Sequence, residues 1–385
     1  MCFSCNDELP PMFDIALPEN SISDSWEPVG VRKKIRSSAR LVPRPWCIMK
    51  NIRSISACIH QNAAIDSNNN LWTWGAKSMA QLEDGSFTND APQDIQRVPQ
   101  KIMNHALMVS CGGWHTMCVT EDCTLWTWGE NEFGQLGLGD FDKRSQPVCV
   151  MEEVKLACAG EYQSFVIKKD HTLWGWGLND SGTLLDADRY CHTPKLLLDS
   201  VVHVSCGSHV IVAVRQDGTL WAWGHNIYGT IFTEPMYRRC KPVCLMKNIA
   251  EASCFPSDNN VFGLAIAKNS DLYCFGGERF GSKINMSIRK AGGKNPIKLA
   301  QNISHAYAGN DVVFLQDKWN RLFAFGRNEL GQCGTGKSTA GIKIPTLIMT
   351  HAQQVASGYF HAMCLQTNGN LWIWGGDYGI NIAQR

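Results

Sequence analysis

The sequence offers one short string with the spacing of a nucleotide site. GQCGTGKS, residues 331–338, satisfies the phosphate-loop pattern G-x-x-x-x-G-K-[ST]. Such a loop holds phosphate when a buried strand leads into it and a helix follows, because the amide groups and dipole of the helix face the anion. Here TAGIKIP follows, residues 339–345, and it leads into a proline-containing strand pattern. We therefore expect a turn of a repeated unit at this place.

The potential metal ligands and catalytic groups are scattered. Cys2 and Cys5 form C-x-x-C without a second such pair, and Cys240 and Cys244 are likewise unpartnered, whereas a structural zinc site needs four ligands. The 11 histidines include no H-x-x-x-H pair and no nucleophile with a matched base. The sequence thus predicts no enzyme, no metal site, no catalytic residues and no cofactor.

Composition narrows the class of protein. The chain has 385 residues with 36 Lys+Arg against 35 Asp+Glu, so it is not built as a whole to coat nucleic acid. Its apolar stretches are shorter than a bilayer requires, and its first thirty residues contain six acids and no Lys or Arg, unlike a signal peptide. Seventeen cysteines cannot all pair, which favours reduced thiols in the cytoplasm, or in the nucleus of a eukaryote. Three of them are expected to be small buried hydrophobes: Cys111, Cys206 and Cys364.

The elements that must position any site come from a repeat, which also explains the tryptophans. Ten of the 14 Trp lie in one pentapeptide that begins at Leu71, Leu125, Leu173, Leu220 and Leu371, and aromatic variants begin at Leu272 and Leu322. The spacings are 54, 48, 47, 52, 50 and 49 residues. Seven copies at a period near 50 indicate a repeat architecture.

Each unit is predicted to form four short strands. In LWTWG the two aromatics point to one face of a strand and Leu and Thr to the other. A proline strand precedes each pentapeptide, and a small-residue turn lies 13 residues before its Leu, at Gly112, Gly160, Gly207, Gly309 and Gly358, with Cys58 in the first unit. The sequence therefore predicts an all-β fold, a seven-bladed β-propeller of four-stranded blades, with the aromatics packed between blades. We expect this propeller over residues 44–385, after an irregular leader over residues 1–43.

The second unit strongly resembles the repeat of the regulator of chromosome condensation family. It carries the G-x-x-H-T turn at Gly112–Thr116 and the N-x-x-G-Q-L-G-x-G-D run from Asn131 to Asp140. The resemblance covers roughly residues 40 to 380 and implies a seven-bladed propeller. The family's guanine-exchange member carries an inserted β-wedge that contacts a Ran GTPase, and no comparable insertion occurs here. Its plant ultraviolet-B photoreceptor uses tryptophans in several blades, for which Trp114 is the single counterpart.

Two closures of the ring are compatible with the sequence. The N-terminal proline strand, Arg44 to Lys50, could complete the last blade, or each blade could run from its proline to W-G and close by packing alone. We favour the first arrangement, because it removes exposed sheet edges. The histidines of the turns, His115 and His361, are expected to form hydrogen bonds within their own blades.

The most informative candidate surface is the ring of small-residue turns. Because the blades share one topology, these turns should lie on one face of the disc, and their second residues vary as expected of a partner-binding face. The predicted face consists of His60, Trp114, Tyr162, His209, Asp258, Asp311 and Phe360.

The predicted function is non-catalytic protein binding through this face, with an unidentified protein partner. One alternative is guanine-nucleotide exchange on a small GTPase. Another is association with chromatin or DNA through the basic segment Arg32, Lys33, Lys34 and Arg36, which could equally be a solvated linker. No membrane partner is expected.

Overall fold

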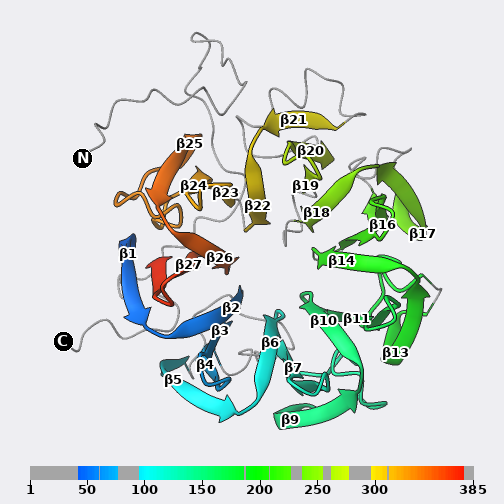
Figure 1. Ribbon diagram of the computed structural model, residues 1–385. Helices are drawn as coiled ribbons and strands as arrows, with labels where there is room; N and C mark the ends of the chain where they lie inside the picture. Colours follow the sequence, from blue (N-terminus) through cyan, green and yellow to red (C-terminus); the bar gives the residue numbers. More distant parts are fainter. Residues whose placement is uncertain are drawn as a thin grey trace.

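Seven antiparallel sheets of four strands each are arranged radially in a computed structural model of the protein (Figure 1). The structure describes residues 42–59, 61–76, 95–185, 188–207, 209–226, 236–254, 262–276, 296–309 and 312–376. All regular elements in these ranges are strands. The predicted seven-bladed β-propeller is confirmed.

The blades follow the chain in order. Blade 1 comprises β2 (Ile52–Cys58), β3 (Gln61–Asp66), β4 (Leu71–Ala76) and β5 (Ile95–Met103); blade 2 comprises β6 (Ala106–Cys111), β7 (His115–Thr120), β8 (Leu125–Gly129) and β9 (Arg144–Met151). Blade 3 comprises β10 (Val154–Ala159), β11 (Gln163–Lys168), β12 (Leu173–Leu178) and β13 (Tyr190–Leu198); blade 4 comprises β14 (Val201–Cys206), β15 (Val210–Arg215), β16 (Leu220–Asn226) and β17 (Met236–Met246). Blade 5 comprises β18 (Ile249–Cys254), β19 (Phe262–Ala267), β20 (Leu272–Gly276) and β21 (Ile297–Ala300); blade 6 comprises β22 (Ile303–Ala308), β23 (Val312–Asp317), β24 (Leu322–Arg327) and β25 (Gly341–Met349). Blade 7 comprises β26 (Ala352–Ser357), β27 (His361–Gln366), β28 (Leu371–Gly375) and β1 (Val42–Met49).

The ring closes by pairing the two ends of the chain. β1 lies antiparallel to β28, with Trp46 opposite Ile373 and Met49 opposite Leu371. The N-terminal strand is therefore the outer strand of blade 7, as the favoured closure predicts. In Figure 1 the first strand of each blade faces the centre, and the fourth lies at the rim.

The repeated prolines lie in the outer strands, or in one case just before one. Pro99, Pro147 and Pro194 belong to β5, β9 and β13, and Pro296 directly precedes β21. A proline cannot donate a hydrogen bond to a neighbouring strand, so an edge strand is the position that tolerates it. The recurring proline thus marks the rim of the disc.

The core is divided among the seven interfaces between blades. At each interface the second aromatic of the pentapeptide packs against the preceding blade. Trp176 of blade 3, for example, is fully buried against Met117, Val119 and Leu125 of blade 2. A buried Trp removes about 150–250 Å² from water, so these residues are the main apolar contact between neighbouring blades. The predicted packing role is confirmed for this position.

The disc has two unlike faces. On one, which we call the loop face, the first strand turns into the second and a long loop joins the third strand to the fourth, as in residues 112–114 and 130–143 of blade 2. The opposite face, which we call the turn face, carries tight turns such as 121–124 and 318–321. The carbonyl of Trp114 accepts a hydrogen bond from the Glu130 amide at 3.0 Å, so the short turn and the long loop of one blade lie together.

Candidate protein-binding face

Four of the predicted binding residues lie on the short turns of the loop face. Trp114, Tyr162, His209 and Phe360 each follow the first strand of a blade, and all four side chains are half-buried. The other three predicted residues, His60, Asp258 and Asp311, lie outside the described residues, as does the basic segment Arg32, Lys33, Lys34 and Arg36.

Neighbouring short turns are joined by backbone hydrogen bonds at two places in the ring. The Gly113 amide of blade 2 donates to the Gly160 carbonyl of blade 3 at 3.0 Å, and the Tyr359 amide of blade 7 donates to the Ile59 carbonyl of blade 1 at 3.4 Å. These bonds connect the inner turns of successive blades directly. At these two places the inner rim of the disc is held together by hydrogen bonds between short turns.

The two turn histidines connect blades, which corrects the prediction that they act within one blade. Nε2 of His115 lies 2.8 Å from Ser164 Oγ of blade 3, and Nε2 of His361 lies 2.6 Å from Asn62 Oδ1 of blade 1. The partners are 49 and 299 residues away along the chain, so sequence proximity could not identify them.

The proton positions around His115 follow from the hydrogen bonds of its partner. The Ser164 hydroxyl donates to the Gln135 carbonyl at 2.7 Å, so the imidazole must donate through Nε2–H, and it is neutral. Burial lowers the pKa of His115 to about 3, because the charged imidazolium would lose its hydration. His115 is thus a neutral structural donor between blades.

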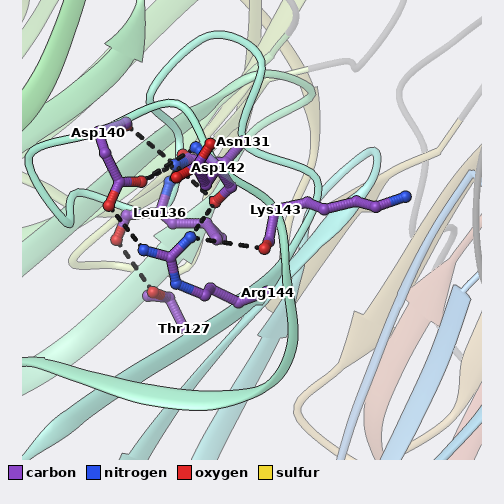
Figure 2. Close-up of polar contacts among 7 residues, drawn as sticks. All are labelled: Thr127, Asn131, Leu136, Asp140, Asp142, Lys143 and Arg144. Atoms are coloured by element: carbon purple, nitrogen blue, oxygen red, sulfur yellow. Dashed lines mark hydrogen bonds and ion pairs between the residues drawn. The ribbon is translucent and has the colours of Figure 1, made fainter.

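The long loop of blade 2 is held by its own polar side chains (Figure 2). Asn131 Oδ1 accepts the Leu136 amide at 2.9 Å, and its Nδ2 donates to the carbonyls of Asp140 and Asp142 at 2.9 and 3.1 Å. Arg144 donates to the Asp140 carboxylate at 2.6 Å and to the Asp142 carbonyl at 2.6 Å. The Asp142 amide and the Arg144 guanidinium lower the pKa of Asp140. The fixed loop backbone presents its remaining side chains in defined positions.

The phosphate-loop string of blade 6 has the same construction. Asn328 Oδ1 accepts the Cys333 amide at 3.0 Å, and its Nδ2 donates to the Lys337 carbonyl at 2.8 Å. The chain then enters the outer strand β25, so no helix follows to face a phosphate. The prediction that GQCGTGKS is a repeat turn is confirmed.

The long loops of blades 2 and 6 are each fastened to the following blade by the buried Trp of that blade. The indole Nε1–H of Trp176 donates to the Gln135 carbonyl at 2.9 Å, and Trp374 donates to the Gln332 carbonyl at 2.8 Å. Gly137 lies against the Trp176 ring, where a side chain would collide with the indole. The Trp that fills the blade interface therefore also positions the loop above it.

Loops and short turns of successive blades meet at the surface. The Phe133 ring, in the blade 2 loop, contacts Tyr162 of blade 3 edge-on with centroids 4.9 Å apart. Ser181 Oγ, in the blade 3 loop, lies 2.8 Å from Nδ1 of His209 in blade 4. The half-burial of Tyr162 and His209 follows, because the preceding loop leans over each of them.

An aromatic patch extends outward from Tyr162 over blades 2 and 3. We define it as Phe133, Phe141, Tyr162, Tyr190 and His192. Tyr190 stacks on Phe133 at 6.0 Å, and Phe141 contacts Tyr190 and His192 edge-on at 6.3 and 5.2 Å. Phe141 is 47% exposed and Tyr190 is 38% exposed. The patch therefore presents rings to solvent on a supported framework.

The exposed members of this patch were not among the predicted residues. Phe141 and Tyr190 lie in a long loop and at the start of an outer strand, outside the turn position that repeats across blades. The available signal was the presence of aromatics near loop sequences that otherwise contain small and polar residues. Within the described ranges, no group of three or more His, Cys, Asp or Glu is arranged to hold a metal ion.

Sequence comparison agrees with this architecture. The repeat described as "Regulator of chromosome condensation (RCC1) repeat" matches residues 68–119, 123–167 and 320–365, and a second form of it matches 109–135, 201–230 and 352–379. The chain belongs to the regulator of chromosome condensation repeat family. Each match of the first form runs from the third strand of one blade to the second strand of the next, so the family repeat is offset from the structural blade by two strands.

Curated relatives of this family share parts of the propeller. The chain is 34% identical over 92 residues to Protein RCC2 homolog of Xenopus laevis, covering 23% of this chain and 17% of the relative. It is 33% identical over 101 residues to the probable E3 ubiquitin-protein ligase HERC6 of Homo sapiens, covering 25% and 9%. It is also 31% identical over 114 residues to the ultraviolet-B receptor UVR8 of Arabidopsis thaliana, covering 29% and 25%. The matched segments thus span a quarter or less of each of these relatives.

Solved structures of similar fold cover most of the ring. Human WBSCR16 has a TM-score of 0.66 at 16% identity and covers 88% of this chain and 90% of that chain. Prp20p of Saccharomyces cerevisiae has a TM-score of 0.64 at 18% identity and covers 85% and 82%. These likenesses concern the fold. In the part of the chain that the structure describes, no helix has the length and apolar character of a membrane span.

Proposed function

We propose that this RCC1-repeat propeller is a non-catalytic protein-binding module that uses its loop face. The observation that carries the proposal is the aromatic patch, whose exposed rings Phe141 and Tyr190 lie beside the rim of short turns. Protein interfaces derive most of their binding energy from a few residues, and aromatic side chains are enriched among them.

Preorganisation supports this use of the patch. The Asn131 and Arg144 contacts fix the loop that carries Phe133 and Phe141, and Trp176 fastens that loop to blade 3. A partner therefore meets rings whose positions are already restricted, which lowers the entropy cost of association. A charged group borders the patch at Tyr190, where the Arg189 guanidinium lies 5.2 Å from the ring centroid. Apolar rings with a polar border are the usual composition of a transient protein interface.

The predicted ring residues have two roles in this proposal. Tyr162 is the half-buried member of the patch that packs against Phe133. Trp114, His209 and Phe360 extend the proposed face around the inner rim. His60, Asp258 and Asp311 remain sequence-based predictions for the same face.

The second candidate is exchange activity on a small GTPase. It draws on the family and on Prp20p, whose structure is reported with its binding to Gsp1p and to histones. A Ran-type GTPase and a histone are therefore partner classes to test, in the cytoplasm or the nucleus. Acceleration of labelled guanine-nucleotide release would support this candidate, and no acceleration at micromolar propeller would reject it.

The direct test compares exposed aromatics on opposite faces. Phe141→Ala removes a 47% exposed ring from the loop face, and Trp319→Ala removes a 55% exposed ring from the turn face. We expect Phe141→Ala to weaken the affinity for a captured protein partner about 10- to 30-fold, the size of a hot-spot truncation. Trp319→Ala should leave this affinity unchanged. Equal melting temperatures would establish that both variants are folded. Retention of every partner by Phe141→Ala and by Tyr190→Ala would reject the proposed patch.

A further inference from the structure

A pair of thiols lies between the inner strands of blades 3 and 4. Sγ of Cys158, in β10, is 3.0 Å from Sγ of Cys206, in β14. Both side chains are half-buried, and both are free thiols in the structure. The contact joins two cysteines that are 48 positions apart, in successive blades.

Equivalent positions in other blades show what Cys158 replaces. Serine occupies this place in blades 1, 2, 4 and 5, at Ser56, Ser110, Ser205 and Ser253. Each serine Oγ accepts a hydrogen bond from a backbone amide of the next inner strand, at 2.9, 2.9, 3.1 and 3.3 Å respectively. Cys158 accepts the corresponding amide of Cys206. A cysteine here therefore keeps the connection between blades that serine makes elsewhere, and adds a thiol.

The residue opposite completes the pair at one interface. Cys111 and Cys254 are the residues whose amides donate these hydrogen bonds in blades 2 and 5, but each of them faces a serine, Ser56 or Ser205. Cys206 is the equivalent amide donor in blade 4, and it faces Cys158. Of the interfaces described, this is the one that brings two thiols together.

We propose that Cys158 and Cys206 form a reversible disulfide between blades 3 and 4 when the protein meets a peroxide. The Cys158 thiolate attacks hydrogen peroxide, giving Cys158 sulfenic acid and hydroxide, which takes up a proton as water. The Cys206 sulfur then attacks the Cys158 sulfur and forms the S–S bond, and the sulfenic hydroxyl leaves with the proton of the Cys206 thiol as a second water. Two thiols and one peroxide thus give one disulfide and two waters. A low-molecular-weight thiol returns the pair to its reduced state by exchange.

The surroundings favour reaction at Cys158. The hydrogen bond that Cys206 donates lowers the pKa of the Cys158 thiol, which raises the share of the reactive thiolate. Burial raises the pKa of Cys111 to about 12 and also raises that of Cys254, so those thiols stay protonated. The sulfurs of the pair need to close from 3.0 Å to about 2.05 Å to bond, a small movement of two side chains.

The position of the pair connects it with the loop face. Cys158 precedes the turn that carries Tyr162, and Cys206 precedes the turn that carries His209. A disulfide would join the inner ends of two blades directly beneath these turns. It would also restrict the unfolded chain across 48 residues, which stabilises the oxidised protein.

Tryptic mapping of the full chain after treatment with hydrogen peroxide tests the proposal. Cleavage gives peptides 156–168 and 196–215, each with a single cysteine, Cys158 or Cys206. We expect these peptides to be linked, with a mass about 2 Da below their sum, and to separate on reduction. Cys111 and Cys254 should remain available to alkylation after unfolding.

The control is Cys158→Ser, which installs the residue that four other blades already carry. It should fold with an unchanged melting temperature, give no linked peptides and show no stabilisation by peroxide, whereas the wild-type midpoint should rise by several degrees on oxidation. Oxidation of Cys158 and Cys206 to unlinked acids, or recovery of both as free thiols at peroxide levels that oxidise exposed Cys149, would overturn the proposal.

Discussion

Replacing Gly137 by alanine tests whether the loop of one blade and the buried Trp of the next form one packed unit. Gly137 has a φ of 74°, and a Cβ there would lie 2.7 Å from Nε1 and 2.8 Å from Cε2 of Trp176. Gly139 has a similar φ of 85°, but the nearest atom to its added Cβ is Cγ2 of Thr193 at 3.9 Å. The two alanine variants therefore share a backbone penalty and differ in the collision with Trp176.

The expected free energies separate these effects. A non-glycine residue in the left-handed region lowers the free energy of unfolding by about 1–2 kcal/mol, and this penalty applies to both variants. Overpacking against Trp176 costs about 1–3 kcal/mol more, and displacement of the indole from the Gln135 carbonyl costs about 1 kcal/mol. We expect Gly137→Ala to lower the free energy of unfolding by about 3–6 kcal/mol, and Gly139→Ala by about 1–2 kcal/mol.

Urea unfolding followed by far-ultraviolet circular dichroism measures both changes. Adding Trp176→Phe gives the decisive comparison, because it removes Nε1 and part of the ring that a Cβ on Gly137 would meet. In that background the cost of Gly137→Ala should fall to that of Gly139→Ala. Equal costs for the two single variants, or an unchanged Gly137→Ala cost without the indole, would refute the packing argument.

Two other predictions concern acid stability and ring closure. Because the pKa of His115 is lowered to about 3, the unfolded chain binds a proton that the folded chain does not, so stability is lost as pH falls below about 6.5. His115→Gln installs the residue found at the equivalent positions Gln61 and Gln163. In urea titrations, its free energy of unfolding should fall by about 2 kcal/mol less than that of the wild type between about pH 7.5 and 5. Identical pH profiles of the two proteins would contradict this. Deleting residues 1–50 removes β1, so the free energy of unfolding should be about 2–3 kcal/mol lower than after deletion of residues 1–41, through the half-buried Ile48 and Met49 alone. Equal melting temperatures for these two truncations would count against closure by β1.

The repeat made most of the fold predictable. The pentapeptide fixes the third strand of each blade by its period of two, the proline identifies the outer strand, and the unpaired proline strand at Arg44–Lys50 indicates how blade 7 is completed. Each of these signals is local in the chain, so spacing alone reveals it.

The contacts between blades were less accessible to sequence reasoning. His115 meets Ser164 and Trp176 meets Gln135, in each case across an interface between two units, and no local pattern encodes such a meeting. Tyr162 was predicted as a contact residue, yet the loop carrying Phe133 partly covers it and moves the exposed aromatic surface outward to Phe141 and Tyr190. Loop conformation decided this outcome, and it depends on the side-chain hydrogen bonds of Asn131 and Arg144.

The measurement that most directly tests protein binding through the loop face is quantitative affinity purification of three forms of the chain. Wild type, Phe141→Ala and Trp319→Ala would be compared at equal abundance and equal melting temperature. A partner reduced about 10-fold or more with Phe141→Ala and retained with Trp319→Ala is the predicted result. Partners that are lost with Trp319→Ala and retained with Phe141→Ala would place binding on the turn face and contradict the account.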